Sequence, residues 1–185
     1  MVAHSLVHAE PRGLSRADYD RMAELGFFRG ERVELIRGIV VRMAAIGPPH
    51  ADVIERLTEL LVPPLVGRAR VRIQLPFLAG DESEPEPDVA IVAATSHAAE
   101  HPRQTFLLIE VADSSLAYDR ETKGPLYAAS GVPEYWIVDV GARAIELYAV
   151  PVEGRYTRFE RFEVHQEIRP AAFADVSISI GSLFG

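Results

Sequence analysis

Two apolar runs stand out in the hydrophobic pattern of the chain, and each carries one acidic residue. Residues 106–112 read Phe-Leu-Leu-Ile-Glu-Val-Ala, with Glu110 near the end. Residues 89–92 read Val-Ala-Ile-Val and follow Pro87 and Asp88 directly. Short continuous runs of β-forming residues are typical of strands buried on both faces, and proline suits the entry of a strand. The pattern therefore predicts two buried strands with a carboxylate near one end of each.

Amphipathic patterns predict further elements in the first half of the chain. Alternation indicates strands, and spacings of three and four residues indicate helices. We expect a first helix that buries Tyr19, Met22 and Ala23, a hairpin that turns at Gly38, and a longer helix that ends at a pair of prolines. The expected elements are a helix over 16–25, strands over 32–36 and 39–43, a helix over 50–65 and a strand over 70–75.

The second half of the chain predicts a crossover unit. A strand over 105–112 is followed by a helix over 119–130 and a strand over 133–139, and Pro125 should kink the helix or delay its start. Such a connection is right-handed and makes its two strands parallel. Antiparallel or edge strands are expected over 144–149, 156–164 and 176–180. Together these elements predict an α/β fold, a mixed β-sheet flanked by helices with additional antiparallel strands and hairpins.

Composition narrows the class of protein. The 185 residues suit one domain, which we expect over 14–185 after a flexible tail over 1–13. The chain has no cysteine, which excludes thiol catalysis, and no apolar run reaches the roughly 18 residues of a membrane span. A cytoplasmic protein is the expectation. The net charge of −8 argues against a non-specific polyanion binder, although it is compatible with a nuclease whose metal ions neutralise acidic ligands.

Asp88 and Glu110 are the strongest candidates for chemistry. A buried carboxylate must be paired, protonated or bound to a cation, because burying an unpaired charge is costly. If the two strands are neighbours they lie about 4.8 Å apart, and the two carboxylates could share one divalent cation. The alternative for Glu110 is a strand-end residue that reaches solvent or an arginine. Glu34 lies either on a solvent-facing side or on a partly apolar side of its strand.

Lys123 is the only lysine, since the other 18 of the 19 basic residues are arginines. A lysine amine can shift its pKa and handle a proton, whereas a guanidinium cannot. Its position in a helix that returns to the sheet makes it a candidate for the same site as Glu110. A chance location is the alternative.

Three more residues are candidates for binding a substrate. Arg70 and Arg72 share one side of an alternating strand, which is either its solvent-facing side or a phosphate-facing stripe. His50 stands at the start of the helix over 50–65, either as a capping or surface residue or as a contributor to a site.

These residues together resemble the PD-(D/E)xK nuclease superfamily, and more closely the Uma-type family of restriction endonucleases. The resemblance covers about 14–184. Its most specific segment is 109–139, which reads IEVADSSLAYDRETKGPLYAASGVPEYWIVD. The other matching segments are RVELIRG over 32–38, PPH over 48–50 and PEPDV over 85–89.

The resemblance implies a restriction-endonuclease-like core in which Asp88 and Glu110 bind Mg²⁺ and Glu34 contributes to the site. In the wider superfamily the lysine would stand two residues after Glu110, where this chain has Ala112. The resemblance to the Uma-type family places that function at Lys123 instead. Gln74, on the strand before Asp88, is a further candidate that would orient water or a ligand.

We therefore expect a metal-dependent endonuclease that hydrolyses phosphodiester bonds of DNA with Mg²⁺, or with Mn²⁺ as a substitute. A homodimer is expected, because two-fold symmetry is the simplest way to cut both strands. One alternative is a non-catalytic binding or assembly module on the same fold. The other is a metal hydrolase that acts on a small phosphate ester.

Overall fold

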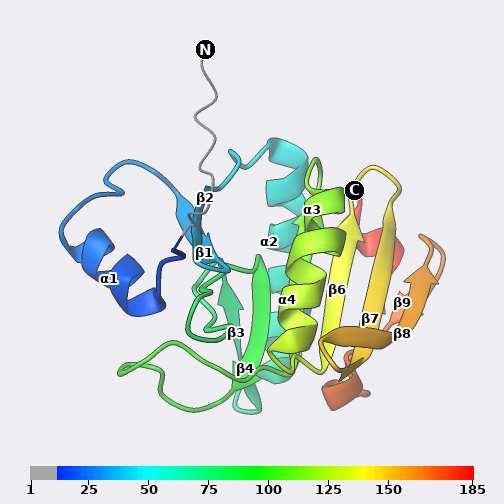
Figure 1. The fold of residues 1–185 in the computed structure, drawn as a ribbon. Helices are drawn as coiled ribbons and strands as arrows, with labels where there is room; N and C mark the ends of the chain where they lie inside the picture. Colours follow the sequence, from blue (N-terminus) through cyan, green and yellow to red (C-terminus); the bar gives the residue numbers. More distant parts are fainter. Residues whose placement is uncertain (1–11) are drawn as a thin grey trace.

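A computed structural model describes residues 12–185, and a six-stranded mixed sheet lies at its centre (Figure 1). β5 and β6 are parallel, while all other neighbours in this sheet are antiparallel. The predicted mixed sheet and its parallel crossover are therefore confirmed. In sheet order the strands are β3 (Ala69–Ile73), β4 (Val89–Ala93), β5 (Leu107–Ala112), β6 (Glu134–Asp139), β7 (Ala144–Val152) and β8 (Arg155–Phe162).

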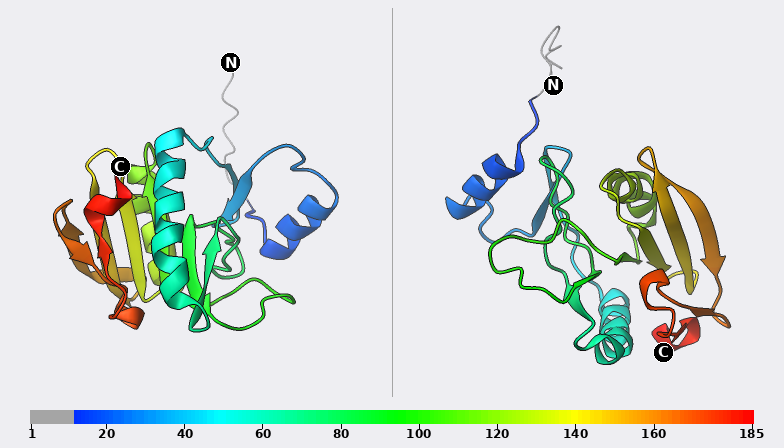
Figure 2. Two further views of the ribbon diagram at one scale, coloured as in Figure 1. Left: turned by 180° about the vertical axis from the view of Figure 1, so that it is seen from behind. Right: turned by 90° about the horizontal axis from the view of Figure 1, so that it is seen from below.

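Helices cover both faces of the sheet (Figures 1 and 2). α2 (Pro48–Leu65) packs one side of its surface, including Leu57 and Leu61, against the face that carries Ile109 and Trp136. The opposite face is covered by three consecutive helical segments. These are α3 (Leu116–Tyr118), the π-helical turn η1 (Asp119–Lys123) and α4 (Gly124–Ala129). Because β4, β5 and β6 are buried on both faces, their sequences read as continuous apolar runs rather than as alternation.

The N-terminal part forms a lobe beside the sheet. It comprises α1 (Arg16–Glu24) and a hairpin of β1 (Val33–Ile36) and β2 (Ile39–Arg42), as predicted. Both turn residues of the hairpin, Arg37 and Gly38, have positive φ, which a two-residue turn of this kind requires. A single β-bridge between Leu35 and Glu84 joins the hairpin to the chain segment before β4.

The expectation that α1 buries Tyr19, Met22 and Ala23 is wrong. No residue of this helix is buried, and Ala23 is exposed. The Tyr19 hydroxyl donates to the Val33 carbonyl, and the Tyr19 ring stacks on Phe28. The helix therefore packs only against its own lobe, which is too small to enclose it.

Prolines lie at three predicted helix boundaries, of which two shift and the end of α2 at Leu65 is as predicted. α2 begins at Pro48 rather than after the prolines, because a missing N–H costs nothing in the first turn of a helix. Pro63 and Pro64 lie inside the last turn of α2 and do not stop it before Leu65. Pro125 follows a helix that starts earlier than predicted, at Leu116, and that passes through the π-turn η1.

The C-terminal residues form short elements that cover the α2 side of the sheet. The strand predicted over 176–180 shrinks to two residues, because Ile180 begins a 3₁₀ turn. The elements are β9 (Glu167–Ile168), η2 (Ala171–Phe173), β10 (Ile178–Ser179) and η3 (Ile180–Leu183). Residues 1–11 of the predicted tail lie outside the described residues. No helix within 12–185 has the length and apolar character needed to cross a membrane.

Candidate active site

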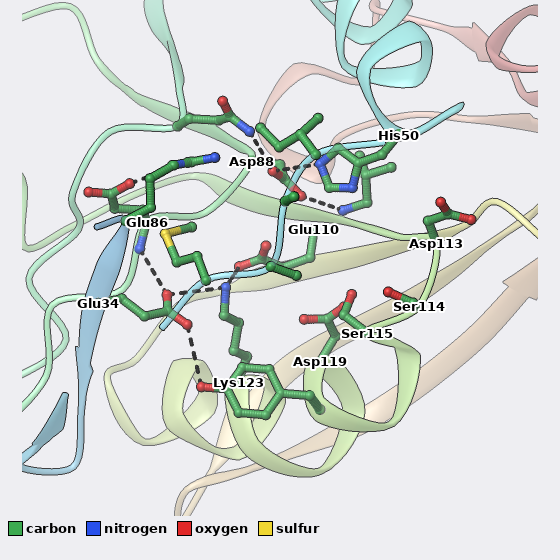
Figure 3. A pocket seen from close by; sticks show the side chains of 18 of the residues that line it. Glu34, His50, Glu86, Asp88, Glu110, Asp113, Ser114, Ser115, Asp119 and Lys123 are labelled. Carbon is green, nitrogen blue, oxygen red and sulfur yellow. Dashed lines mark hydrogen bonds and ion pairs between the residues drawn. The ribbon is translucent and has the colours of Figure 1, made fainter. Parts of the chain in front are cut away.

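Asp88 and Glu110 lie side by side at one end of the sheet (Figure 3). β4 and β5 are antiparallel neighbours with Val89 opposite Ile109, so the same register places Asp88 opposite Glu110. Both side chains point to the face that η1 and α4 cover. Both residues are buried, with Asp88 6% and Glu110 3% exposed. The predicted pair of neighbouring carboxylates is therefore present.

Three donors hold the Asp88 carboxylate. His50 Nε2 lies 3.1 Å and Gln74 Nε2 3.2 Å from Asp88 Oδ1, and the Val111 N–H donates to Oδ2 at 2.8 Å. Burial alone would raise the pKa of Asp88, but the hydrogen bonds from these groups outweigh it and keep the pKa below the ordinary value. The same contact raises the pKa of His50. Asp88 is therefore held as a carboxylate.

Glu110 receives two donors on one oxygen. Lys123 Nζ donates to Glu110 Oε1 at 3.0 Å, and the Tyr127 hydroxyl donates to the same oxygen at 2.6 Å. Tyr127 is fully buried between Phe77 and Tyr135. The side chain of Glu110 is thus fixed through Oε1, and within residues 12–185 its Oε2 accepts no hydrogen bond.

The π-turn η1 brings Lys123 to the sheet. Pro125 has no N–H and would clash with the carbonyl one turn earlier in an α-helix, and a wider turn avoids this. The Gly124 N–H accordingly donates to the Asp119 carbonyl, five residues back, and the Tyr135 hydroxyl donates to the same carbonyl. Asp119 and Lys123 are both buried as a result.

Glu34 reaches the site from the separate hairpin β1–β2. Its Oε2 lies 3.3 Å from Lys123 Nζ and accepts from the Glu86 N–H at 3.3 Å, while Oε1 accepts from Tyr118. Burial opposes the ammonium, but the carboxylates of Glu110 and Glu34 outweigh it and raise the pKa of Lys123. Lys123 is therefore an ammonium that bridges the two sheets.

A cavity of about 340 Å³ opens above these residues. The apolar segment 43–47 lines part of the cavity, and Asp113, Ser115 and Asp119, labelled in Figure 3, line another part. Ser115 Oγ donates to Asp119 Oδ2 at 2.5 Å, and burial raises the pKa of Asp119. The cavity is thus an acidic pocket with one apolar side.

Of the four predicted substrate-binding residues, two line the cavity and two do not. His50 and Gln74 contact Asp88 and line it. Arg70 is exposed on the edge strand β3, and Arg72 donates to the Pro76 carbonyl and contacts His101. The edge strand carries both arginines along its length and away from the end of the sheet where Asp88 lies, so the two arginines do not reach this pocket.

Sequence reasoning missed Tyr127 and Asp119. Both are four residues from Lys123, one on each side, so a helix brings all three to one face. That spacing was the available signal. It was hidden because Pro125 argues against a regular helix through this segment.

The donor set fits a hard divalent cation. Mg²⁺ is typically held by one or two carboxylates and keeps several waters, and Asp88 and Glu110 supply two carboxylates at an open pocket. Within residues 12–185 no group of three or more His, Asp or Glu side chains is arranged to hold a metal ion. A cation here would therefore depend on the two strand acids, with water or substrate completing its coordination.

Comparison with known proteins shows the family and the fold of the chain. A family model described as "Putative restriction endonuclease" (Uma2) matches residues 16–181. No curated protein matches the chain. The crystal structure of a putative nuclease belonging to DUF820 from Anabaena variabilis is similar over 89% of this chain and 96% of that chain, with a TM-score of 0.67 and 18% sequence identity. The likeness of fold confirms the predicted nuclease-like architecture, and the family match shows that the chain belongs to the Uma2 family, the putative restriction endonucleases.

Proposed function

We propose that this protein is a metal-dependent endonuclease that hydrolyses phosphodiester bonds of DNA, with Asp88 and Glu110 as the ligands of Mg²⁺ or Mn²⁺. The observation that carries the proposal is the meeting of three buried groups. Two carboxylates from neighbouring strands oppose each other, and the only lysine of the chain donates to one of them. A buried, open-sided acid pair beside a cation matches what phosphodiester hydrolysis requires.

Each residue has a distinct part in the proposed reaction. A divalent cation would polarise the scissile phosphate and lower the pKa of a water molecule. Asp88 and Glu110 hold that cation, and His50 and Gln74 keep Asp88 oriented. Lys123 orients the attacking water and offsets the charge that builds on the phosphate oxygens as the phosphorus–oxygen bond breaks. Glu34 holds the Lys123 amine from the side opposite Glu110.

Substitution of the strand acids tests the proposal. Asp88→Asn and Glu110→Gln should each lower the rate of plasmid nicking in Mg²⁺ or Mn²⁺ at least 100-fold and abolish calorimetric metal binding. Glu121→Gln is the matched control, because Glu121 is exposed on the same turn as Lys123 and does not line the cavity. If wild type leaves every DNA form intact and behaves like Asp88→Asn, and neither binds metal, the proposed function is wrong.

The predicted homodimer is a separate expectation. Two-fold symmetry would present two pockets to the two strands of a duplex. Light scattering after size-exclusion chromatography would measure the mass against the 20.4 kDa of one chain.

A further inference from the structure

The charges around the cavity do not favour an intact duplex. Six acidic side chains line it against three basic ones, Arg32, Arg42 and Lys123. Each of the three is already paired within the described residues: Arg32 with Glu86 at 3.6 Å, Arg42 with Glu31 at 2.6 Å, and Lys123 with both site glutamates. A duplex carries one negative charge per roughly 1.7 Å of its length, and proteins that grip it neutralise several phosphates at once.

The size of the cavity also argues against an intact duplex as the substrate. Asp88 and Glu110 form the floor of a cavity of about 340 Å³. That volume lies near the lower end of sites that enclose a small ligand, about 300–1,000 Å³. It suits one nucleotide unit that enters from the opening and brings its phosphate to the floor.

One wall of the cavity is apolar and suits a flat, uncharged group such as a nucleic-acid base. The segment after β2 contributes Met43, Ala44, Ala45 and Ile46, with Val41 beside them, and Ile46 is 41% exposed. These side chains have no hydrogen-bond donor for a phosphate, but they offer apolar contact to a base. In a duplex the bases are stacked inside and cannot reach such a wall, whereas in a single strand they can.

We propose that this site accepts an unpaired nucleic-acid strand, with the scissile phosphate at Asp88 and Glu110 and an adjacent base against the wall of residues 43–46. The inference rests on the proposed nuclease function and narrows its substrate. A single strand needs one pocket for each cut, so two-fold symmetry is not required for this substrate.

Matched oligonucleotides test the inference. With Mn²⁺, kcat/KM should be compared for a single-stranded 20-mer of DNA, the RNA of the same sequence, the blunt DNA duplex, a duplex with an unpaired tail, and bis(p-nitrophenyl) phosphate. We expect at least ten-fold faster cleavage of a single strand than of the blunt duplex, and cuts confined to the unpaired tail. Comparison of the DNA strand with the RNA strand shows which of the two nucleic acids the site accepts.

The dependence on salt adds an independent measure. A single strand held through one or two phosphates should give a slope of log(kcat/KM) against log[NaCl] of about −1. The inference would be overturned if the blunt duplex were cleaved as fast as the single strand or faster. A salt slope steeper than −3 would also overturn it. So would hydrolysis of bis(p-nitrophenyl) phosphate with no cleavage of any strand. If none of these substrates is cleaved in Mg²⁺ or Mn²⁺, the proposed function itself fails and the inference with it.

A pair of isoleucines tests the wall directly. Ile46→Ser should raise KM for the single strand three- to ten-fold and change kcat less than two-fold, because Ile46 lines the cavity. Ile39→Ser is the control, since Ile39 is 64% exposed on β2, just before the segment that carries Ile46, and does not line the cavity. Both side chains are at the surface, so both variants should fold. Equal KM values for Ile46→Ser and Ile39→Ser would contradict a base-binding wall.

Discussion

Asp88 and Glu110 are held by different kinds of donors, although they stand side by side. Asp88 is bound on both oxygens, by His50 and Gln74 at Oδ1 and by the Val111 N–H at Oδ2. Glu110 is bound on a single oxygen by Lys123 and Tyr127. The two acids therefore differ in how many of their oxygens accept hydrogen bonds. Both oxygens of Asp88 do so, whereas within residues 12–185 only Oε1 of Glu110 does.

Removal of the Tyr127 hydroxyl should weaken the proposed metal site without unfolding the protein. Tyr127→Phe keeps the ring between Phe77 and Tyr135 but frees Glu110 Oε1 from one donor. We expect a three- to thirty-fold rise in the Mn²⁺ concentration that gives half-maximal cleavage, with a smaller change in kcat at saturating metal. Metal titration of the cleavage rate measures this, and an unchanged metal requirement would assign Tyr127 a packing role alone.

Glu84 gives a prediction for the dependence of stability on pH. Burial, with the nearby Asp20 and Glu86 carboxylates, raises the pKa of Glu84 from 4.5 to about 7 in the folded protein, while Arg16 opposes the shift. Because the folded pKa lies above the unfolded value, this group stabilises the fold below about pH 4.5, and that contribution is lost as pH rises to about 7.

Glu84→Gln should therefore become more stable than wild type as pH rises. The difference should be near zero at pH 4 and on the order of 1–3 kcal/mol at pH 8, measured by urea unfolding. Glu82→Gln, an exposed neighbour, serves as the control. A constant difference between Glu84→Gln and wild type across this range would contradict the raised pKa.

Both acids and the lysine of the site could be predicted from the chain, but Tyr127 could not. Asp88, Glu110 and Lys123 each break a local rule, as a charge beside an apolar run or as the single lysine of an arginine-rich chain. Tyr127 breaks no rule, because an aromatic residue in a helix is ordinary. Its role depends on the crossing of α4 over β5, which no local pattern contains.

At the scale of elements, η1 is the segment that makes the site. It buries Lys123 and Asp119, while the more exposed Arg120 pairs with Glu146 of β7 through two hydrogen bonds. Glu146 also accepts from Arg161 and Tyr148. The π-turn therefore contacts β7 through Arg120 and the pocket through Lys123.

Loss of the ion pair between Arg120 of η1 and Glu146 of β7 should lower both the stability and the activity of the protein. Arg120→Gln leaves the buried Glu146 with fewer donors, and we expect a loss of about 1–3 kcal/mol in the free energy of unfolding. Cleavage should fall as well, because η1 carries Lys123. Arg158→Gln removes an exposed pair with Glu160 and should cost at most about 1 kcal/mol. Chemical denaturation of both variants checks this, and equal losses would contradict the anchoring role.

The presence of strands could be predicted from the chain more reliably than the boundaries of helices. The apolar runs around 89–92 and 106–112 predicted buried strands because such runs have few other solutions. Pro125 misled the prediction of helix start, since a proline inside a helix is tolerated here by widening one turn. Burial of α1 failed for another reason: its apolar residues indicate a helix, but they cannot tell how large a partner surface the fold provides.

At the scale of the whole molecule, the protein combines a thick sheet core with a thin N-terminal lobe. β5 and β6 are buried along their full length, whereas α1 has no buried residue and leaves Leu25 and Phe27 exposed. Figure 2 shows the helix standing off the sheet. Resistance to local opening should therefore differ strongly between the two parts.

Hydrogen exchange should resolve this difference. We expect amides of α1 to exchange at least 100-fold faster than those of β5 and β6, because opening the helix exposes little apolar surface. Mass spectrometry of peptides from 14–30 and 105–115 measures both regions in one experiment. Similar protection of the two peptides would show that the lobe and the sheet open as one unit.

The position of Lys123 between Glu34 and Glu110 has a consequence for how its variants are interpreted. One ammonium joins the hairpin to the main sheet, and the only β-bridge that the hairpin makes within residues 12–185 pairs Leu35 with Glu84, which lies outside the main sheet. Deleting that charge leaves the buried Glu34 without its cationic partner and removes one of the two donors to Glu110, which weakens the attachment of the hairpin to the main sheet. An inactive Lys123→Met enzyme therefore reports a weakened attachment of the hairpin as well as the loss of the amine. Glu34→Gln separates the two effects, because it removes the ion pair to the hairpin and leaves Lys123 paired with Glu110.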